Sequence, residues 1–455
     1  MNGNNRISPK ELQKSLILVI LGISFGITFF NIIGNPVGGP PFTGFMRALG
    51  ASNLVYGVVM ALPVLGAIVQ IFASFYIEKT GRRKSVFLIF GFIHRFLWIP
   101  IALIPLFFRF ENKYIIIIII TVLVTISSAS NSTASICFLS WMGDLIPMEV
   151  RGKFFSTRTA VFTSVGAVTS ILVGRYLDTI NGLNGYAVIF IIAAILGAAD
   201  IFCFIWVKNP KMEISEDRMP FKKLLTIPFK DKNYLKFILF AAIWYFGTNI
   251  ALPFLNIYML EYLNLSYFLI FLFIQVINNI STVLLILFLG KVVDLYGNKP
   301  VQAICCTMLA ILQFMWIFAA PENFVIVPVI YFLNGICLAG FELTTTNLSI
   351  WLPPEKNRSI YVANYTLVIS VIGIAMAYIS GGAYLELTKD FFTNLNLSFV
   401  NGQKFSNFHS LFIISTIIRL TAIFLVHPKV SEENSKSPWD LIKSLKFLFL
   451  RRQNT

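Results

Sequence analysis

Two charged residues lie inside apolar stretches of this sequence, where their chemistry could include proton exchange. Glu342 falls within the apolar run 324–350, and Arg158 falls about one turn into the run 154–177. A charge inside a membrane is costly unless it is paired or faces an aqueous cavity. We predict an ion pair between them, with Glu342 as the proton-exchanging group and Asp200 as a second candidate. Extension of Arg158 to the membrane surface and a local hydrogen bond of Glu342 are the alternatives.

Amides and aromatic residues form a second set with possible chemistry. Tyr245, Asn249 and Asn256 are spaced by four and seven residues, so they share one side of a helix. Such side chains could bind a neutral, hydrogen-bonding solute, or they could only hold helices together. The predicted solute-binding residues are Asn31, Asn35, Asn131, Trp244, Tyr245, Asn249, Asn256, Gln275, Asn278 and Asn334.

A short charged link, "SFYIEKTGRRKS" at 74–85, joins two apolar runs. Glu78 stands where a helix ends, and the partial negative charge of a helix C-terminus disfavours an acid there unless a positive group meets it. Gly81 permits a tight turn. Lys79, Arg82 and Arg83 supply positive charge. We predict that the link controls the opening and closing of the protein on its cytoplasmic side. The alternative is that the positive charge of the link only keeps the link on the cytoplasmic side of the membrane and has no role in conformational change.

The sequence repeats itself in two places. "GKVVDLYGNKP" at 290–300 is a weaker copy of the link, in which Asp294 matches Glu78 and Gly297 matches Gly81. Further on, 147–174 matches 354–381, so that Arg151 aligns with Arg358. Two related sets of six helices are typical of transporters built from duplicated halves. Asp294, Gly297, Arg151, Arg158 and Arg358 are therefore further candidates for gating residues.

The amino-acid composition indicates that membrane-spanning helices must position the candidate residues named above. Hydrophobic residues make up 57% of the 455 residues and charged residues 13%, against about 25% charged residues in soluble proteins. Lipid requires backbone groups to pair within each segment, and a helix of roughly 20 apolar residues spans the bilayer core. We predict an all-α integral membrane protein with twelve transmembrane helices, at 16–36, 54–77, 85–108, 114–139, 154–177, 186–207, 235–261, 265–289, 301–320, 324–350, 359–384 and 407–427.

This pattern predicts a six-helix bundle at 1–207, a cytoplasmic linker at 208–234, a second bundle at 235–427 and a cytoplasmic tail at 428–455 with an amphipathic helix. Most of the 36 Lys and Arg residues fall at one end of the predicted spans, which places both termini in the cytoplasm. This bias also accounts for the net charge of +15 without nucleic acid. The five cysteines are expected to be free, and the three histidines have no metal-ligand spacing.

The charged link and the repeat resemble the Major Facilitator Superfamily, over nearly the whole chain. The family pattern Gly-x-x-x-Asp-Arg-x-Gly-Arg-Arg reads here as Ser74, Glu78, Lys79, Gly81, Arg82 and Arg83, with Ser and Glu as departures. The second copy keeps Gly290, Asp294 and Gly297 but has Leu295, Asn298 and Lys299 at the other positions. "SWMGDLIPMEVRGKFF" (140–155) and "GFELTTTNL" (340–348) are similar to segments of a broad bacterial branch.

The resemblance implies two pseudo-symmetric six-helix bundles that expose a shared polar chamber to alternate sides. It implies that Glu78 meets the start of span 11 near Ser359, and that Asp294 meets the start of span 5 near Phe154. The implied activity is secondary active transport of a small organic solute, coupled to protons, by a monomer in a bacterial cell membrane. No enzyme activity, cofactor or metal is expected. A drug/proton antiporter and a non-transporting membrane sensor or scaffold are the alternatives.

Overall fold

The structure is a computed structural model that describes residues 8–34, 38–108, 113–180, 182–211, 228–354, 358–395, 397, 404–432, 435–441 and 443. Over these residues the regular secondary structure is helical, and Ala320 and Asn323 form an isolated bridge. Twelve helical segments are long and apolar enough to cross a membrane. The predicted all-α architecture with twelve spans is thus confirmed.

The chain divides into two compact units, which are described separately below. Unit 1 contains residues 1–218 together with 253–275, and unit 2 contains residues 219–252 together with 276–455. The segment 253–275 belongs by sequence to the second predicted bundle, yet its contacts place it in unit 1. The predicted division into halves differs from the compact units at this segment.

The elements of unit 1 follow the order of the first six predicted spans. They are α1 (Pro9–Ile33), α2 (Pro40–Ala48), α3 (Asn53–Leu65), η1 (Gly66–Ile68), α4 (Val69–Thr80), α5 (Arg83–Phe96), α6 (Trp98–Phe107), α7 (Lys113–Leu145), α8 (Met148–Thr179), α9 (Leu183–Cys203) and η2 (Phe204–Trp206). Two further elements, the π-helical turn η4 (Tyr258–Tyr262) and α13 (Tyr267–Phe271), lie in segment 253–275. The short helix α12 (Leu252–Ile257) begins at the boundary between the units.

Unit 2 holds the remaining elements. They are η3 (Pro228–Lys230), α11 (Lys232–Asn249), α14 (Asn278–Tyr296), α15 (Asn298–Met315), η6 (Trp316–Phe318), α16 (Ile326–Trp351), α17 (Arg358–Val368), η7 (Ile369–Ala375), α18 (Met376–Leu395), α19 (Asn407–Thr421), η9 (Ala422–Val426) and η10 (His427–Lys429). The π-helical turn η5 (Leu272–Ile277) crosses the boundary between the units.

Local sequence explains where several helices begin. Ser8 and Glu11 form a reciprocal capping box at the start of α1, with Pro9 in its first turn. The Asp231 carboxylate caps α11 by accepting hydrogen bonds from the amides of Asn233 and Tyr234. These caps supply acceptors for amides that the first turn of a helix leaves unpaired.

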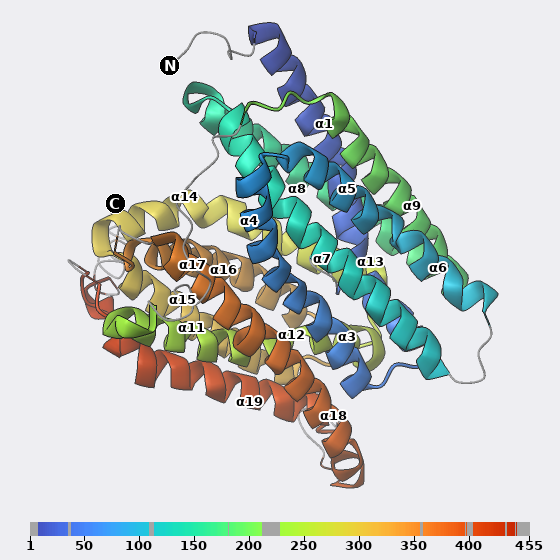
Figure 1. Cartoon of the computed structure of the whole chain (residues 1–455). Coiled ribbons are helices and arrows are strands. Elements are labelled where there is room, and N and C mark those ends of the chain that lie inside the picture. The colour runs from blue at the N-terminus through green and yellow to red at the C-terminus, as the bar shows by residue number, and fades with distance from the viewer. Residues whose placement is uncertain are drawn as a thin grey trace, which may run out of the picture. The chain divides into compact units, whose positions relative to one another are not determined.

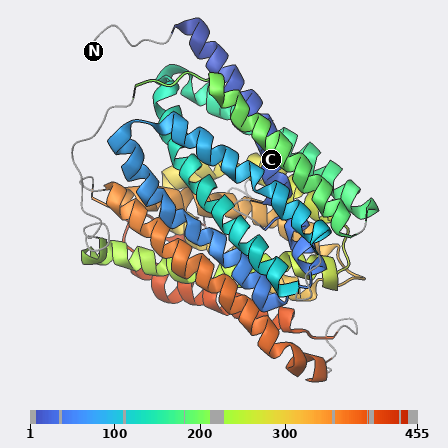
Figure 2. The ribbon, with the colours of Figure 1, turned by 45° about the vertical axis from the view of Figure 1, so that its right-hand side comes forward.

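Each unit has its own apolar core. In unit 1, α1 packs along α9 and α5 packs along α7 (Figures 1 and 2), and Trp141 and Phe204 lie in the buried cluster between them. In unit 2, α16 packs between α14 and α15, and α19 lies against α11 and α15. The core of unit 2 includes Phe237, Trp244 and Phe341. These cores hold the polar side chains described next in fixed positions.

Candidate functional site

The first repeated link is tied into unit 1 by Arg83. Gly81 ends α4 with a φ of +66°, a conformation that favours glycine. The Arg83 side chain is fully buried. It forms an ion pair with Asp144 at the end of α7 and donates to the carbonyls of Ser140 (3.0 Å) and Pro210 (2.9 Å). Arg83 therefore fastens the link to its own bundle.

The other charges of this link lie at the surface. Glu78, Lys79 and Arg82 are exposed. The Glu78 carboxylate accepts a hydrogen bond of 3.1 Å from the Ser74 hydroxyl, one turn earlier in α4. Glu78 and the start of span 11 belong to different units, so the contact that the family resemblance implies for Glu78 stays a prediction.

The second repeated link is held differently. Gly297, at a φ of +92°, precedes the first residue of α15 and provides no side-chain cap. The Glu432 carboxylate, beyond the last span, accepts hydrogen bonds from the amides of Asn298 (2.9 Å) and Lys299 (2.7 Å). Asp294 is exposed at the end of α14, and its implied contact with span 5 stays a prediction.

Three further arginines were predicted as gating residues. Arg151 donates to the carbonyls of Gly143 (2.9 Å) and Ile146 (3.2 Å) at the end of α7, where a positive charge stabilises the helix terminus. The Arg158 guanidinium lies 5.9 Å from the centre of the Phe138 ring. Arg358 begins α17. Arg158 and Glu342 lie in different units, and the ion pair between them stays a prediction.

Asp200 lies in an ion pair inside unit 1. Its carboxylate on α9 accepts a hydrogen bond of 3.0 Å from Arg95 on α5, and both side chains are buried. On α1, a Cβ at Gly26 would lie 2.5 Å from Oδ2 of Asp200. The Arg95 guanidinium also lies 4.2 Å from the centre of the Phe29 ring. Three helices thus meet at this pair.

Unit 2 contains a buried arginine in the corresponding spans. Arg419 on α19 donates to the carbonyl of Leu309 (3.1 Å) and to Oε1 of Gln313 (3.2 Å), both on α15. Its guanidinium lies 5.6 Å from the Trp244 ring on α11. Within the described part of the chain no carboxylate pairs with Arg419.

Four of the eight predicted amides donate to protein oxygens. Asn31 donates to the Gly166 carbonyl (3.0 Å), Asn249 to the Tyr245 carbonyl (2.7 Å), Asn256 to the Gly38 carbonyl (3.0 Å) and Asn334 to Oδ1 of Asn278 (3.1 Å). The bonds of Asn31, Asn256 and Asn334 favour packing between segments as their role, whereas the bond of Asn249 stays within α11. Asn131 is half-buried on α7, and Gln275 lies in η5. Asn35 lies outside the described residues.

A group of polar side chains in unit 2 includes buried atoms that form no hydrogen bond with the described residues. Asn364 on α17 is 1% exposed, and neither its amide oxygen nor its nitrogen has a partner among the described residues. The next residue, Tyr365, packs with Tyr245 against the small cluster of Ala242 and Ile369. A buried amide without partners is costly, so such a side chain indicates a place for water or a ligand.

Glu342 on α16 completes this group, which we call the α11–α16–α17 site and define as Tyr245, Glu342, Asn364 and Tyr365. The Glu342 side chain is exposed, and Glu342 directly follows Phe341 on α16. The adjacent Phe341 ring lies 5.7 Å from that of Tyr245. Sequence reasoning identified Tyr245 and Glu342 but missed Asn364 and Tyr365, because burial of one amide leaves no periodic signal.

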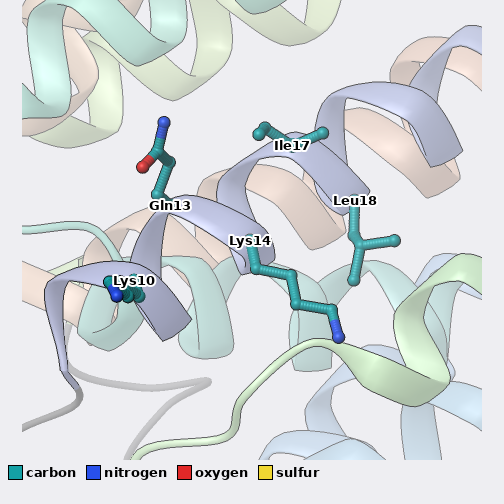
Figure 3. A pocket seen from close by; sticks show the side chains of 5 residues that line it. All are labelled: Lys10, Gln13, Lys14, Ile17 and Leu18. Atoms are coloured by element: carbon teal, nitrogen blue, oxygen red, sulfur yellow. The ribbon is translucent and has the colours of Figure 1, made fainter.

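A surface hollow of about 320 Å³ lies elsewhere, on the first turns of α1. Figure 3 shows it lined by Lys10, Gln13, Lys14, Ile17 and Leu18, all from one helix. None of the predicted solute-binding residues lines this hollow. It therefore adds nothing to the α11–α16–α17 site.

Segment 253–275 is fastened to unit 1 by α8. The Asp178 carboxylate accepts hydrogen bonds from the amides of Tyr267 (2.7 Å) and Phe268 (3.1 Å), the first residues of α13. A carboxylate at a helix N-terminus is favourable because unpaired amides and the helix dipole meet it there. The Arg175 guanidinium lies 3.9 Å from the Phe268 ring centre, and a Cβ at Gly174 would lie 2.7 Å from the Phe268 Cα.

An ion pair and a hydroxyl contact secure the same segment. Arg47 on α2 forms a two-point ion pair with Glu261, with Nη2 donating to Oε2 at 2.8 Å. The hydroxyls of Tyr186 and Tyr267 lie 2.7 Å apart. Sequence reasoning missed these residues, because Arg47 and Glu261 are 214 positions apart and no pattern links them.

The comparisons with known proteins agree with this architecture. A family model described as Major Facilitator Superfamily matches residues 16–281 and 238–453. Among curated proteins there is no match. The solved structures that resemble the chain include the nucleoside transporter NupG (TM-score 0.66, 13% identity, 93% of this chain and 100% of that one).

Two more solved structures have the same fold. One is a bacterial homologue of the iron transporter ferroportin in an inward-facing state (TM-score 0.68, 14% identity, 94% of this chain and 100% of that one). The other is a D-xylose-proton symporter (TM-score 0.62, 14% identity, 92% of this chain and 98% of that one). At these identities the likeness concerns the fold.

Proposed function

Because the chain belongs to the Major Facilitator Superfamily, we propose that it is a secondary active transporter that moves a small organic solute across the cell membrane by alternating access. The twelve spans and the polar side chains buried within them support this function. We propose that both termini face the cytoplasm, which agrees with the positive charge of the linker and tail.

One observation carries the alternating-access proposal. Segment 253–275, which belongs by sequence to the second half, is held on first-half helices by Asp178 and by the Arg47–Glu261 ion pair. In these contacts, α2 and the end of α8 meet the connection between η4 and α13. They lie at the end of unit 1 that is remote from the start of α1. We propose that they form the closed external gate.

The backbone supports movement of this gate. The chain enters segment 253–275 at Pro253, just after α11 ends at Asn249, and leaves it within the π-helical turn η5. Proline and π-helical turns interrupt the regular hydrogen-bond ladder of a helix, and bends occur at such places. The points at which the chain enters and leaves segment 253–275 are thus irregular.

The α11–α16–α17 site indicates the chemistry of the solute. Asn364 offers an amide donor and acceptor, and Tyr245 and Tyr365 offer hydroxyls and aromatic faces. Such a site suits a neutral solute with several hydroxyl or amide groups. NupG and the D-xylose-proton symporter carry solutes of this kind, according to their names. We propose a nucleoside or a sugar as the substrate class.

Glu342 is the proposed proton-coupling residue. It is the carboxylate of the site, and its side chain is exposed and outside every ion pair formed among the described residues. Asp200 is less suited to this role because Arg95 holds it in a buried pair. A carboxylate that gains a proton when the solute binds would link solute movement to the proton gradient.

Transport assays in proteoliposomes test this proposal. We expect labelled nucleosides or D-xylose to accumulate under an inward proton gradient, and an uncoupler to abolish accumulation. Glu342→Gln should lose gradient-driven accumulation but keep solute exchange between equal pools. Glu322→Gln, which changes an exposed acid outside the site, is the control. Absence of both exchange and thermal stabilisation with every nucleoside and sugar tested would contradict the proposed substrate class.

A further inference from the structure

The residues after the last span pack back onto unit 2 as an ordered strap, which we define as residues 428–432 and 435–441. Val430 is 2% exposed and Leu441 is 3% exposed, and both join the core cluster of unit 2. Ser431 and Asn233 exchange two hydrogen bonds, of 2.8 and 2.9 Å. The strap is thus fixed at the start of α11 as well as in the core.

The strap contacts four successive residues of the second repeated link, 296–299, which we call link 296–299. The Lys436 amide donates to the Tyr296 carbonyl at 3.0 Å, and the Lys436 ammonium lies 4.8 Å from the centre of the Tyr296 ring. A Cβ at Gly297 would lie 3.0 Å from the Cβ of Ser435. The Lys299 ammonium donates to the Pro428 carbonyl at 3.0 Å.

Glu432 is the anchor of these contacts. Its carboxylate accepts from the amides of Asn298 and Lys299 and, at 2.7 Å, from the Asn298 side chain. The helix that starts here has Gly297 at its cap position, and Pro300 has no amide hydrogen to offer. Glu432 therefore accepts the two available amide hydrogens of the first turn, and its negative charge faces the positive end of the helix dipole.

The two copies of the link are fixed in different ways. The first copy is fixed to its bundle from within by the buried Arg83. In the second copy, Lys299 stands at the matching position and is only half-buried. Fixation of the second copy depends on a segment that follows the last span, and such a segment can detach without unfolding a span.

From these contacts we propose that the strap is an intramolecular control element, with Glu432 as its anchor. When docked it caps α15 and immobilises link 296–299, and when released it frees the link. Control of the transport rate rests on the proposed function, whereas capping of α15 does not.

Hydrogen exchange of the full-length protein in lipid nanodiscs tests the capping. In Glu432→Ala we expect the amides of Asn298 and Lys299 to exchange about tenfold faster or more, since hydrogen bonds to a charged group are lost. Glu322→Ala, which removes an exposed acid between η6 and α16, should leave these amides unchanged. Unchanged exchange in Glu432→Ala would overturn the proposal.

Solute flux in proteoliposomes tests the control. Glu432→Ala should change the initial rate at least about twofold relative to Glu322→Ala, and Glu432→Asp, which keeps the charge, should restore part of the difference. Faster exchange with an unchanged rate would show a static anchor and overturn the control role. If Glu432→Ala does not fold, Glu432→Gln, which keeps the size of the side chain, gives the same readouts. If neither Glu322→Ala nor the unmodified protein moves any solute, the transport proposal fails while the exchange result still decides the capping.

Discussion

Arg95 in the first half and Arg419 in the second half are both buried between the third and sixth spans, but the two halves satisfy these arginines differently. In the first half Arg95 pairs with Asp200. In the second half Arg419 donates to the neutral oxygens of Gln313 and Leu309 and pairs with no carboxylate among the described residues. Both arginines also lie near an aromatic ring from the first span of their half, at 4.2 Å from Phe29 and 5.6 Å from Trp244.

The difference shows that a buried cation can be held by a countercharge or by dipoles and an aromatic face. An ion pair couples two residues, so that removal of either leaves an uncompensated buried charge. A cation held by dipoles and an aromatic face leaves only neutral groups behind when it is removed. The two arginines are 4% and 6% exposed, so burial itself does not distinguish them.

The largest effect is expected from Asp200→Asn, which leaves Arg95 buried without its countercharge. We expect the free energy of unfolding to fall by about 3–5 kcal/mol, measured by chemical unfolding in mixed micelles. Asp390→Asn, at an exposed position of α18, is the control. The double variant Asp200→Asn/Arg95→Gln should recover part of the loss, and a further loss would contradict the pairing.

The next largest effect is expected when each arginine is removed and the two losses in free energy of unfolding are compared. Arg95→Met leaves the Asp200 carboxylate unpaired and should cost about 3 kcal/mol. Arg419→Met leaves two neutral oxygens and should cost only about 1–2 kcal/mol. The same unfolding measurement gives both values. Equal losses would mean that the countercharge is not what separates the two sites.

Glycines beside the two arginine sites give a smaller effect. A Cβ at Gly26 would lie 2.5 Å from a carboxylate oxygen of the pair, whereas one at Gly247 would lie 2.9 Å from the Ile418 side chain. Gly26→Ala should cost about 1–3 kcal/mol through overpacking. Gly247→Ala should cost less, because its nearest contact is longer, 2.9 Å against 2.5 Å, and no charged group takes part in it. The reverse order would indicate that Asp200 has room to move.

Gln313→Glu should have the smallest effect, because it converts the second site into a copy of the first. The Gln313 oxygen already lies 3.2 Å from Arg419, so a carboxylate needs no new geometry. The attraction and the cost of burying the new charge largely cancel, and we expect a change within about 1 kcal/mol. A clear stabilisation in the unfolding measurement would show that Arg419 lacks compensation.

The sequence predicted the twelve spans well, because an apolar run of about 20 residues can pair its own backbone groups in lipid only as a helix. It did not predict the partners within unit 1. Arg95 and Asp200 are 105 positions apart, and helical periodicity says which side chains share a face but not which helices meet. For Arg83 the prediction of a gating residue stays untested, and the structure shows it inside its own bundle.

The α11–α16–α17 site shows the same limit. Tyr245 stood out through its spacing and Glu342 through its charge in an apolar run. Asn364 did not, because its importance comes from complete burial without a partner, and burial is a property of the packed helices. The amides that did stand out, such as Asn31, donate to neighbouring helices.

The fastening of segment 253–275 to unit 1 has a consequence for biosynthesis. The helices that carry Arg47 and Asp178 leave the ribosome long before Glu261 and Tyr267 are translated. During that time the Arg47 guanidinium and the Asp178 carboxylate lack these partners. A polypeptide that ends at residue 218 would leave exposed the surface of unit 1 that binds segment 253–275. Two separately expressed fragments, divided in the linker, should therefore recognise each other through this surface and reassemble inside the membrane.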